Sequence, residues 1–364
     1  MQFTSAGAPR RWRLWVLGLC GVLIVVCFSG CENIGYYRQA VAGEYQILAH
    51  QKPIPVLVAA SNTPAALRKE LVDVLKIREF AATDMKEPAD ENYLKYTDLH
   101  RRFVVWNVNV APPLSLSPKV WWFPIVGEAS YRGYFSEKAA VRYAERWKKK
   151  GWDVYVDGIE VYSTLGWFHD PVLNTFINEP EGNLAEIIFH ELAHRRLFVP
   201  SDTDFNEAFA TAVSMEGIRR WFNANKQPQE FERYHTEAER EHQFIKLVMD
   251  IRPKLEAVYD DPTLSDAVKL ERKKEVIAEL RHNYETLKNQ QWGGNKDYDA
   301  WFAEPINNAK LNTIAAYYQL EPAFEALIRA NGGDMEKFFH AVEGLAKMPL
   351  AQRHEELRKL LPKS

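Results

Sequence analysis

The sequence has few cysteines, and their position limits the chemistry available to the chain. Only three of its 364 residues are cysteine, Cys20, Cys27 and Cys31, and all lie near the N-terminus. The rest of the chain therefore has no thiol nucleophile and no disulfide, and its fold must depend on a hydrophobic core. A composition of 46% hydrophobic and 13% aromatic residues is sufficient for such a core.

An excess of positive charge is also absent. The chain has 46 Lys and Arg against 49 Asp and Glu, a formal net charge of −3 and a pI near 6.4. Binding to a phosphate backbone requires a basic surface, so we expect no nucleic-acid partner. No internal repeat or low-complexity linker divides the sequence. We therefore expect one mature domain over residues 31–364.

No apolar run reaches the roughly twenty residues that a spanning helix needs. The longest covers residues 14–28, follows Arg10, Arg11 and Arg13, and predicts an export signal over residues 1–30. It ends in Phe28-Ser29-Gly30-Cys31, which resembles a bacterial lipobox and implies lipidation of Cys31. The alternative is an uncleaved N-terminal anchor. Both interpretations predict an exported chain held at a membrane of the cell envelope, facing the periplasm.

The periodicity of the sequence predicts an α+β fold that is mainly helical, with a small sheet. Residues 103–112 alternate apolar and polar like a strand, residues 120–135 add β-prone aromatic residues, and residues 153–166 suggest two short strands around Asp157-Gly158. Helices are expected at 62–85, with Thr63 as cap, at 137–151, and almost throughout from residue 183. Residues 228–291 predict a charged helical hairpin, either a solvated arm or a partner-binding surface.

The stretch FHELAHRRLFVPSDTDFNEAFA, residues 189–210, carries the strongest chemical signal. A capping-box pattern at Asn183 to Glu186 and a stop at Pro200 predict a helix from about Leu184 to Phe198. His190 and His194 then lie one turn apart on the same face, within reach of one metal ion. Glu191, beside the first histidine, can address a metal-bound water without binding the metal.

A third ligand is needed, and Glu207 is the first candidate. Six or so connecting residues predict antiparallel helices, which would bring Glu207 to within about 3 Å of the level of His194. Two alternatives remain. Asp204 to Glu207 is itself a capping-box pattern, so Glu207 could cap its own helix, and Asp202 or Asp204 could be the ligand instead. Two histidines and one carboxylate would leave an open position for water, as in catalytic zinc sites.

These residues, HELAH followed by NEAFA, resemble the gluzincin class of zinc peptidases. With SYRGYF, YSTLGWFHDP and NNAKLNTIAAYYQLEPAF, nearly all of the mature chain is similar to a bacterial lipoprotein family of zinc aminopeptidases. The resemblance implies one Zn²⁺ bound by His190, His194 and Glu207, with Glu191 as general base. Known gluzincin aminopeptidases carry the strand motif Gly-x-Met-Glu-Asn, and this sequence has YSTLGWFHDP in its place. Whether the chain would cleave a peptide at its end or internally therefore stays open.

Other groups could complete a peptidase site. Tyr317 is a candidate oxyanion donor, or a core aromatic residue. Residues 162–167 could be an edge strand that pairs with a peptide, Asp170 could receive a substrate amine, and His169 could lie near the zinc. The expected function is zinc-dependent hydrolysis of peptides. The alternative is a catalytically silent envelope lipoprotein with a structural metal site, whose helical arm binds a partner. The sequence does not predict an oligomeric state.

Overall fold

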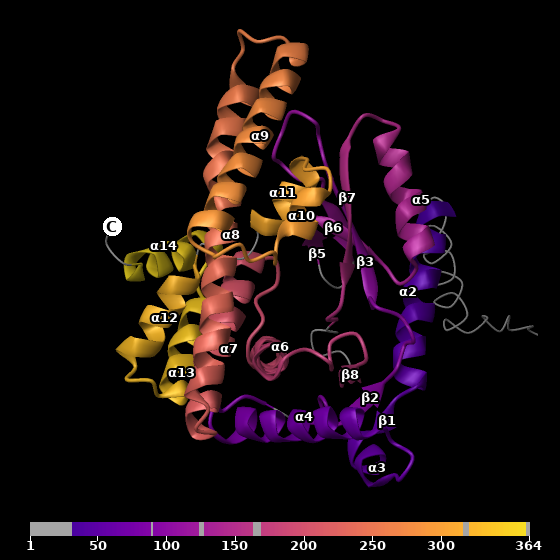
Figure 1. Cartoon of the computed structure of the whole chain (residues 1–364), viewed down its shortest axis with the longest axis vertical. Coiled ribbons are helices and arrows are strands. Elements are labelled where there is room, and N and C mark those ends of the chain that lie inside the picture. The colour runs from indigo at the N-terminus through magenta and orange to yellow at the C-terminus, as the bar shows by residue number, and fades with distance from the viewer. Residues whose placement is uncertain (1–30, 89, 124–126, 163–168, 316–319, 362–364) are drawn as a thin grey trace, which may run out of the picture.

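The computed structural model describes residues 31–88, 90–123, 127–162, 169–315 and 320–361. It confirms a mainly helical α+β fold with small sheets. Figure 1 shows a long pair of helices rising on one side, a small sheet beside them, and a helix lying across the base of the molecule. No helix within the described ranges has both the length and the apolar character needed to cross a membrane.

Three helices form the N-terminal part of the described chain: α2 (Cys31–Ala49), α3 (Ile54–Ala59) and α4 (Ala65–Thr83), with strand β1 (Lys52–Pro53) before α3. Helix α4 lies across the base in Figure 1 and buries Leu71, Val74 and Ile77 in the largest core cluster. The prediction that Thr63 caps this helix was wrong. Pro64 occupies the N-cap position without a side-chain cap, because its fixed φ already suits a helix start.

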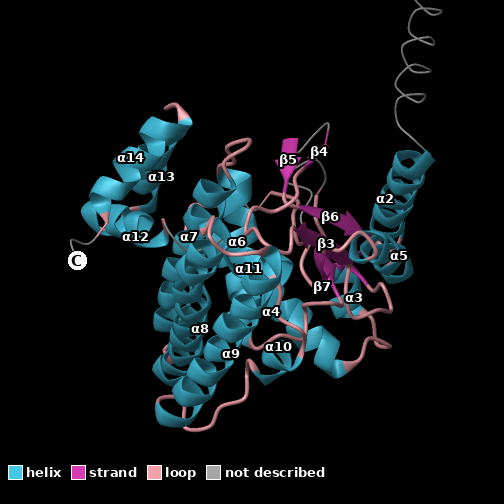
Figure 2. Cartoon of the chain, turned by 90° about the horizontal axis from the view of Figure 1, so that it is seen from above, coloured by secondary structure: helices cyan, strands magenta, loops and turns pink. Residues whose placement is uncertain are grey.

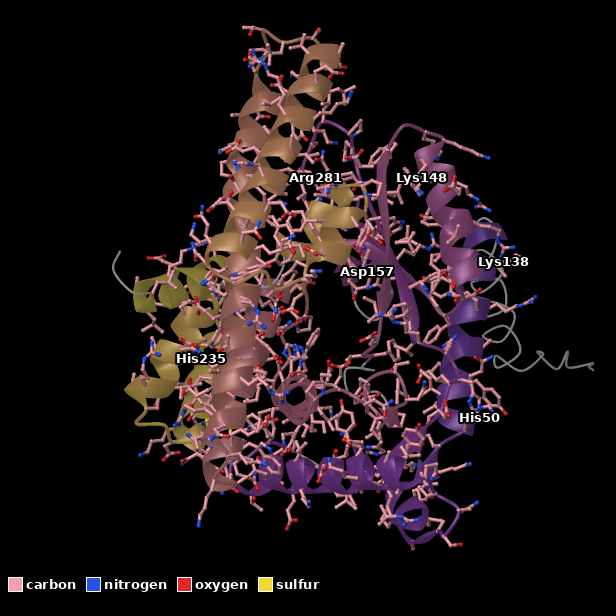
Figure 3. All side chains as sticks on the ribbon, in the orientation of Figure 1. His50, Lys138, Lys148, Asp157, His235 and Arg281 are labelled. Atoms are coloured by element: carbon pink, nitrogen blue, oxygen red, sulfur yellow. The ribbon has the colours of Figure 1, made fainter. Side chains whose placement is uncertain are left out.

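The central sheet has β3 (Val105–Ala111) between two antiparallel neighbours, β6 (Tyr131–Tyr134) and β7 (Asp153–Ile159). Helix α5 (Glu137–Lys148) covers it with Ala140, Tyr143 and Ala144, while Lys138 and Lys148 point away from the sheet (Figure 3). Two smaller sheets join β4 (Trp121–Phe123) to β5 (Gly127–Ala129), and β1 and β8 (Val172–Leu173) to β2 (Lys95–Thr97). The strand predicted at 103–112 is confirmed.

The turn expected at Asp157-Gly158 was wrong. Strand β7 continues through both residues, which pair with Asn107 and Trp106 of β3. The glycine has a packing role instead, since a Cβ at residue 158 would lie 2.5 Å from the ring of Phe103. The aromatic ring takes the space that a side chain would need, and this long-range contact overrides the local turn preference of Asp-Gly.

Helices α6 (Glu181–Arg196) and α7 (Thr203–Ala224) pack antiparallel, as expected from their short connection. At one end Trp221 Nε1 donates to Glu181 Oε1 at 3.0 Å, and at the other Asn206 exchanges two hydrogen bonds with the backbone of Val199. Gly217 allows close approach, because a Cβ there would lie 2.6 Å from Phe189. The outer side of α7 packs on α12 (Glu321–Ala330), α13 (Met335–Ala346) and α14 (Leu350–Leu360).

The predicted helical hairpin is confirmed as α8 (Pro228–Asp260) and α9 (Asp266–Gln290), which lie side by side in Figures 1 and 2. It is more than a solvated arm, because it has an apolar core of its own with α10 (Asp299–Ala303) and α11 (Asn308–Ala315). In this core Tyr284 stacks on Phe302 at 3.9 Å between ring centroids.

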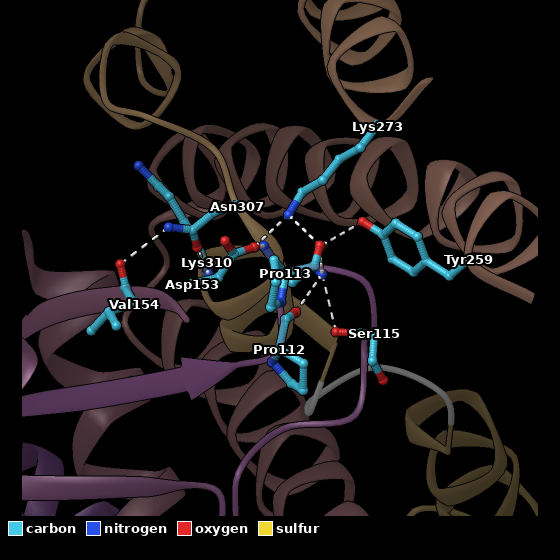
Figure 4. Close-up of polar contacts among 10 residues, drawn as sticks. Pro112, Pro113, Ser115, Asp153, Val154, Tyr259, Lys273, Asn307 and Lys310 are labelled. Carbon is cyan, nitrogen blue, oxygen red and sulfur yellow. Dashed lines mark hydrogen bonds and ion pairs between the residues drawn. The ribbon is translucent and has the colours of Figure 1, made fainter. Parts of the chain in front are cut away.

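A buried polar cluster joins this arm to the sheet (Figure 4). The side-chain amide of Asn308, which is fully buried, accepts a hydrogen bond from the Tyr259 hydroxyl at 2.8 Å. Its nitrogen donates to three backbone carbonyls of the segment after β3, those of Pro112, Pro113 and Ser115. Because the arm and this segment share one set of hydrogen bonds, the arm is fixed against the sheet.

Candidate metal centre

Helix α6 presents the two histidines on its inner face. It begins at Glu181 after Pro180, so the predicted capping box at Asn183 was wrong and that residue lies inside the helix. The fixed φ of proline suits the start of a helix, so Pro180 begins α6 without a side-chain cap. His194 is buried and His190 is partly buried, and their rings stand at 83° with centroids 4.8 Å apart. One helical turn therefore brings both imidazoles to one point, as predicted.

The N-terminus of α7 decides between the two predictions for Glu207. Asp202 is the N-cap, and its side chain accepts a hydrogen bond from the Phe205 backbone N–H at 3.3 Å. The alternative capping box, with Asp204 as its first residue, is therefore wrong, since Asp204 already lies inside the helix. The carboxylate of Glu207 turns instead to the histidines of α6. Asp202 points to Arg353 and His354, and does not belong to the cluster.

Three ligand atoms converge between the helices. Nε2 of His190 and Nε2 of His194 are 3.1 Å apart, and Glu207 Oε2 lies 3.3 Å from the first and 3.7 Å from the second. A metal ion that binds tetrahedrally at about 2.1 Å holds its ligand atoms about 3.4 Å from one another. The observed spacings bracket this value. These three residues could hold a metal ion, and they form the one such group among the described residues.

The charges of the cluster support each other. Burial raises the pKa of Glu207, but hydrogen bonds from both histidines outweigh it and leave the pKa at about 2. Burial lowers the pKa of His190, whereas the hydrogen bond that it donates to Glu207 and the charge of Glu191 raise it, and the net effect is a raised pKa. A carboxylate that stays ionised next to imidazole nitrogens suits a divalent cation.

Two buried atoms beside the cluster have no hydrogen-bond partner among the described residues. They are Oε2 of Glu191 and Nδ1 of His194. Buried polar atoms are rarely left unpaired in native proteins, and exceptions are common at functional sites. The free oxygen of Glu191 lies next to the ligands without joining them. It is therefore available to accept a proton or a hydrogen bond from a bound molecule.

Further titratable groups surround the ligands. Burial and the nearby charge of Glu241 raise the pKa of Glu186, one turn before His190, to about 7. Burial and the charge of Glu191 raise the pKa of Tyr93. Loss of hydration around its hydroxyl and the charge of Glu207 raise the pKa of Tyr131, although this residue is 44% exposed as a whole. Carboxylates and phenols thus line the surroundings of the cluster, an arrangement that is common in active sites.

Several residues singled out in the sequence fall elsewhere. Tyr317, the candidate oxyanion donor, lies outside the described residues, as do 163–168 of the proposed edge strand and the lipobox before Cys31. Of Cys31 only the backbone is described. His169 lies 3.6 Å from Glu91 and is not part of the ligand cluster. Asp170 is buried. Its charge contributes to the raised pKa of Tyr93, for which burial is the largest cause and the charge of Glu191 the second.

Some residues near the centre were not predicted from the sequence. Arg353 and His354 of α14 bind Asp202 and so hold the N-terminus of α7 from the far end of the chain. No local pattern indicates this contact. Tyr131 lies in SYRGYF, one of the stretches that resemble the aminopeptidase family. The resemblance could therefore have indicated this residue as a candidate.

Comparison with known proteins gives a family for the chain. No curated protein and no solved structure matches it. A family model described as "putative aminopeptidase" matches residues 35–357 and so spans both helices of the candidate metal centre, the sheet and the arm. The chain belongs to this putative aminopeptidase family.

Proposed function

We propose that the chain is a zinc-dependent peptidase of the gluzincin type, which hydrolyses peptides in the bacterial cell envelope. The observation that carries the proposal is the convergence of His190, His194 and Glu207 at ligand spacing, with Glu191 close enough for its charge to act on His190. Two imidazoles and one carboxylate leave a position open for water, as catalytic zinc sites require. The family's description as an aminopeptidase agrees with this chemistry.

We assign the proposed catalytic roles from the positions of the side chains. A zinc ion held by the three ligands would polarise the scissile carbonyl and lower the pKa of a bound water. Glu191 takes a proton from the attacking water on its unpaired Oε2 and passes it to the leaving amine. Tyr317 stays the proposed donor to the developing oxyanion.

The state of Glu191 also favours an enzyme over a structural metal site. A metal that only links two helices needs no carboxylate with a free oxygen next to its ligands, and leaving such an atom buried and unpaired costs stability. In a peptidase this atom has a proton to transfer. In a catalytically silent protein, the unpaired oxygen of Glu191 would have no function.

Location is proposed from the sequence. We propose that residues 1–30 direct export and that Cys31 carries the lipid that holds the protein at the membrane. An apolar run of 15 residues behind three arginines, ending at a lipobox-like cysteine, supports this. The same run left uncleaved would also retain the chain at the membrane.

Metal removal and restoration tests the function. The purified full chain is treated with a zinc chelator, dialysed, and assayed against a peptide library that contains both free and blocked amino termini. We expect hydrolysis to disappear on removal and return with about one equivalent of Zn²⁺ per chain, the single site that the ligand set provides. Cleavage of free termini alone would identify an aminopeptidase. Hydrolysis that persists without metal would contradict the proposal.

A further inference from the structure

Helix α2 exposes a continuous apolar face. Ile34 is 48% exposed, Tyr37 43%, Val41 70% and Tyr45 69%. At 100° per residue these four side chains fall within an arc of about 80°. Large apolar side chains exposed singly are normal on a soluble protein, but four of them in one stripe mark an interaction surface.

Within the described part of the chain, the core contacts of α2 come from its opposite side. Ile47 is buried in the core, and Tyr36 packs edge-on against Tyr134 with ring centroids 5.4 Å apart. Gly43 faces Phe135 so closely that a Cβ would lie 2.0 Å from the ring. These contacts fix the rotation of the helix. The stripe cannot turn inward.

The charge of the stripe indicates what covers it. Between Ile34 and Ala49 the only acidic residue is Glu44, which lies beside the Tyr37 edge of the stripe but is partly buried. The exposed residues beside the stripe are Arg38, Ala42 and Ala49, so the one charge there is positive. An apolar face with tyrosines, an exposed cation and no fully exposed carboxylate suits the headgroup region of an anionic bilayer.

A second exposed aromatic side chain lies close by. The Phe123 ring of β4 packs 5.9 Å from the ring of Tyr36, which places the β4–β5 hairpin beside the N-terminal half of α2. Trp122, the preceding residue, is 69% exposed. In Figure 2 this hairpin and the N-terminal end of α2 both project to the upper side of the molecule. Tryptophan is enriched where proteins meet the bilayer interface.

We infer that the α2 stripe (Ile34, Tyr37, Val41 and Tyr45) rests on the lipid bilayer, with Trp122 as a second contact. This inference rests on the proposed membrane attachment but not on the peptidase activity. The apolar run at residues 14–28 ends immediately before α2 begins at Cys31, so any anchor there, cleaved or not, holds this end of α2 at the membrane. The stripe then meets lipid at a high effective concentration.

Spin labels on the full chain test the contact. Cys20, Cys27 and Cys31 are changed to serine, which leaves residues 14–28 as the anchor and removes every other thiol. Val41→Cys carries the label at the stripe, Trp122→Cys tests the second contact, and Glu271→Cys on the exposed side of α9 is the matched control. The chains are reconstituted in vesicles of phosphatidylcholine and phosphatidylglycerol in equal parts. Collision of the label is measured with oxygen, which partitions into lipid, and with a water-soluble nickel complex.

The expected result is a ratio of oxygen to nickel collisions severalfold higher at residues 41 and 122 than at residue 271. Equal ratios in chains that sediment with the vesicles would overturn the inference and leave the anchor intact. Dipolar broadening between labels at residue 41 would also overturn it and identify a second copy of the chain as the occupant. Chains that do not sediment would refute both the anchor and the contact, while the metal-dependent hydrolysis is judged separately.

Discussion

Asp202 Oδ1 lies 2.8 Å from Nε2 of His354, a residue of the last helix. The same carboxylate caps α7 and pairs with Arg353, and both charged side chains are buried. Glu207 projects from this helix a little over one turn later. The C-terminal helix therefore fixes the end of α7 from which a proposed metal ligand extends.

Loss of Asp202 should destabilise the fold. Asp202→Ala removes a helix cap and leaves Arg353 buried without its partner, so we expect the free energy of unfolding to fall by about 3–5 kcal/mol. Asp202→Asn should lose less, because asparagine also caps helices. Asp204→Ala, at the first residue of the alternative capping box, should change stability by less than about 0.5 kcal/mol. Urea unfolding measures all three, and equal effects at 202 and 204 would contradict this cap assignment.

Replacing Glu191 separates catalysis from metal binding. Glu191→Gln keeps the size of the side chain but cannot take the proton of the attacking water. We expect kcat for peptide hydrolysis to fall by about 10²–10⁴, with zinc content unchanged by mass spectrometry. Turnover at the original rate would remove Glu191 from the role of general base. Loss of zinc in this variant would instead make it a ligand.

Replacing Glu207 tests the third ligand. Glu207→Ala deletes one of three protein ligands, so the Kd for zinc should rise by more than the about 10- to 100-fold that loss of a supporting residue costs. Competition with a coloured chelator gives this Kd, and Asp204→Ala serves as the exposed control on the same helix. A Kd equal to that of the original chain would refute coordination by Glu207.

The metal-free protein should show the pH dependence of the pair between Glu207 and His190. The pKa of Glu207 is lowered from 4.5 to about 2, so its stabilising effect is complete above about pH 4.5 and is lost as the pH falls towards 2. The effect also weakens once the pH rises through the raised pKa of His190. We expect the stability difference between the original chain and Glu207→Gln to plateau at weakly acidic pH. A difference that does not vary with pH in urea unfolding would exclude the pair.

The arm should depend on Asn308. Asn308→Asp keeps the shape of the side chain but replaces the nitrogen that donates to three carbonyls with an acceptor, and leaves a charge in a buried site. We expect a loss of at least about 3 kcal/mol in the free energy of unfolding. Asn312→Asp on the same helix, whose Oδ1 accepts from Arg252, keeps that hydrogen bond and should cost less. Equal stability of the two variants would show that the cluster does not join the arm to the sheet.

The sequence alone predicted the features that depend on local periodicity. Strand β3, helix α5 and the hairpin of α8 and α9 were each expected near their observed bounds. The pair His190 and His194 also follows from one helical turn, since residues four apart share a face in any α-helix. The short connection from α6 to α7 was enough to predict their antiparallel packing.

Tertiary structure decided what local pattern left open. Asp204 with Glu207, and Asn183 with Glu186, both fit a capping box, but neither pair caps a helix. Contacts with α14 select Asp202 as the cap and leave Glu207 free to face the histidines. At Gly158 the ring of Phe103 overrode a turn pattern. At Asp202 and at Gly158 a residue distant in sequence supplied an interaction stronger than the local preference, and such interactions form only when the chain folds.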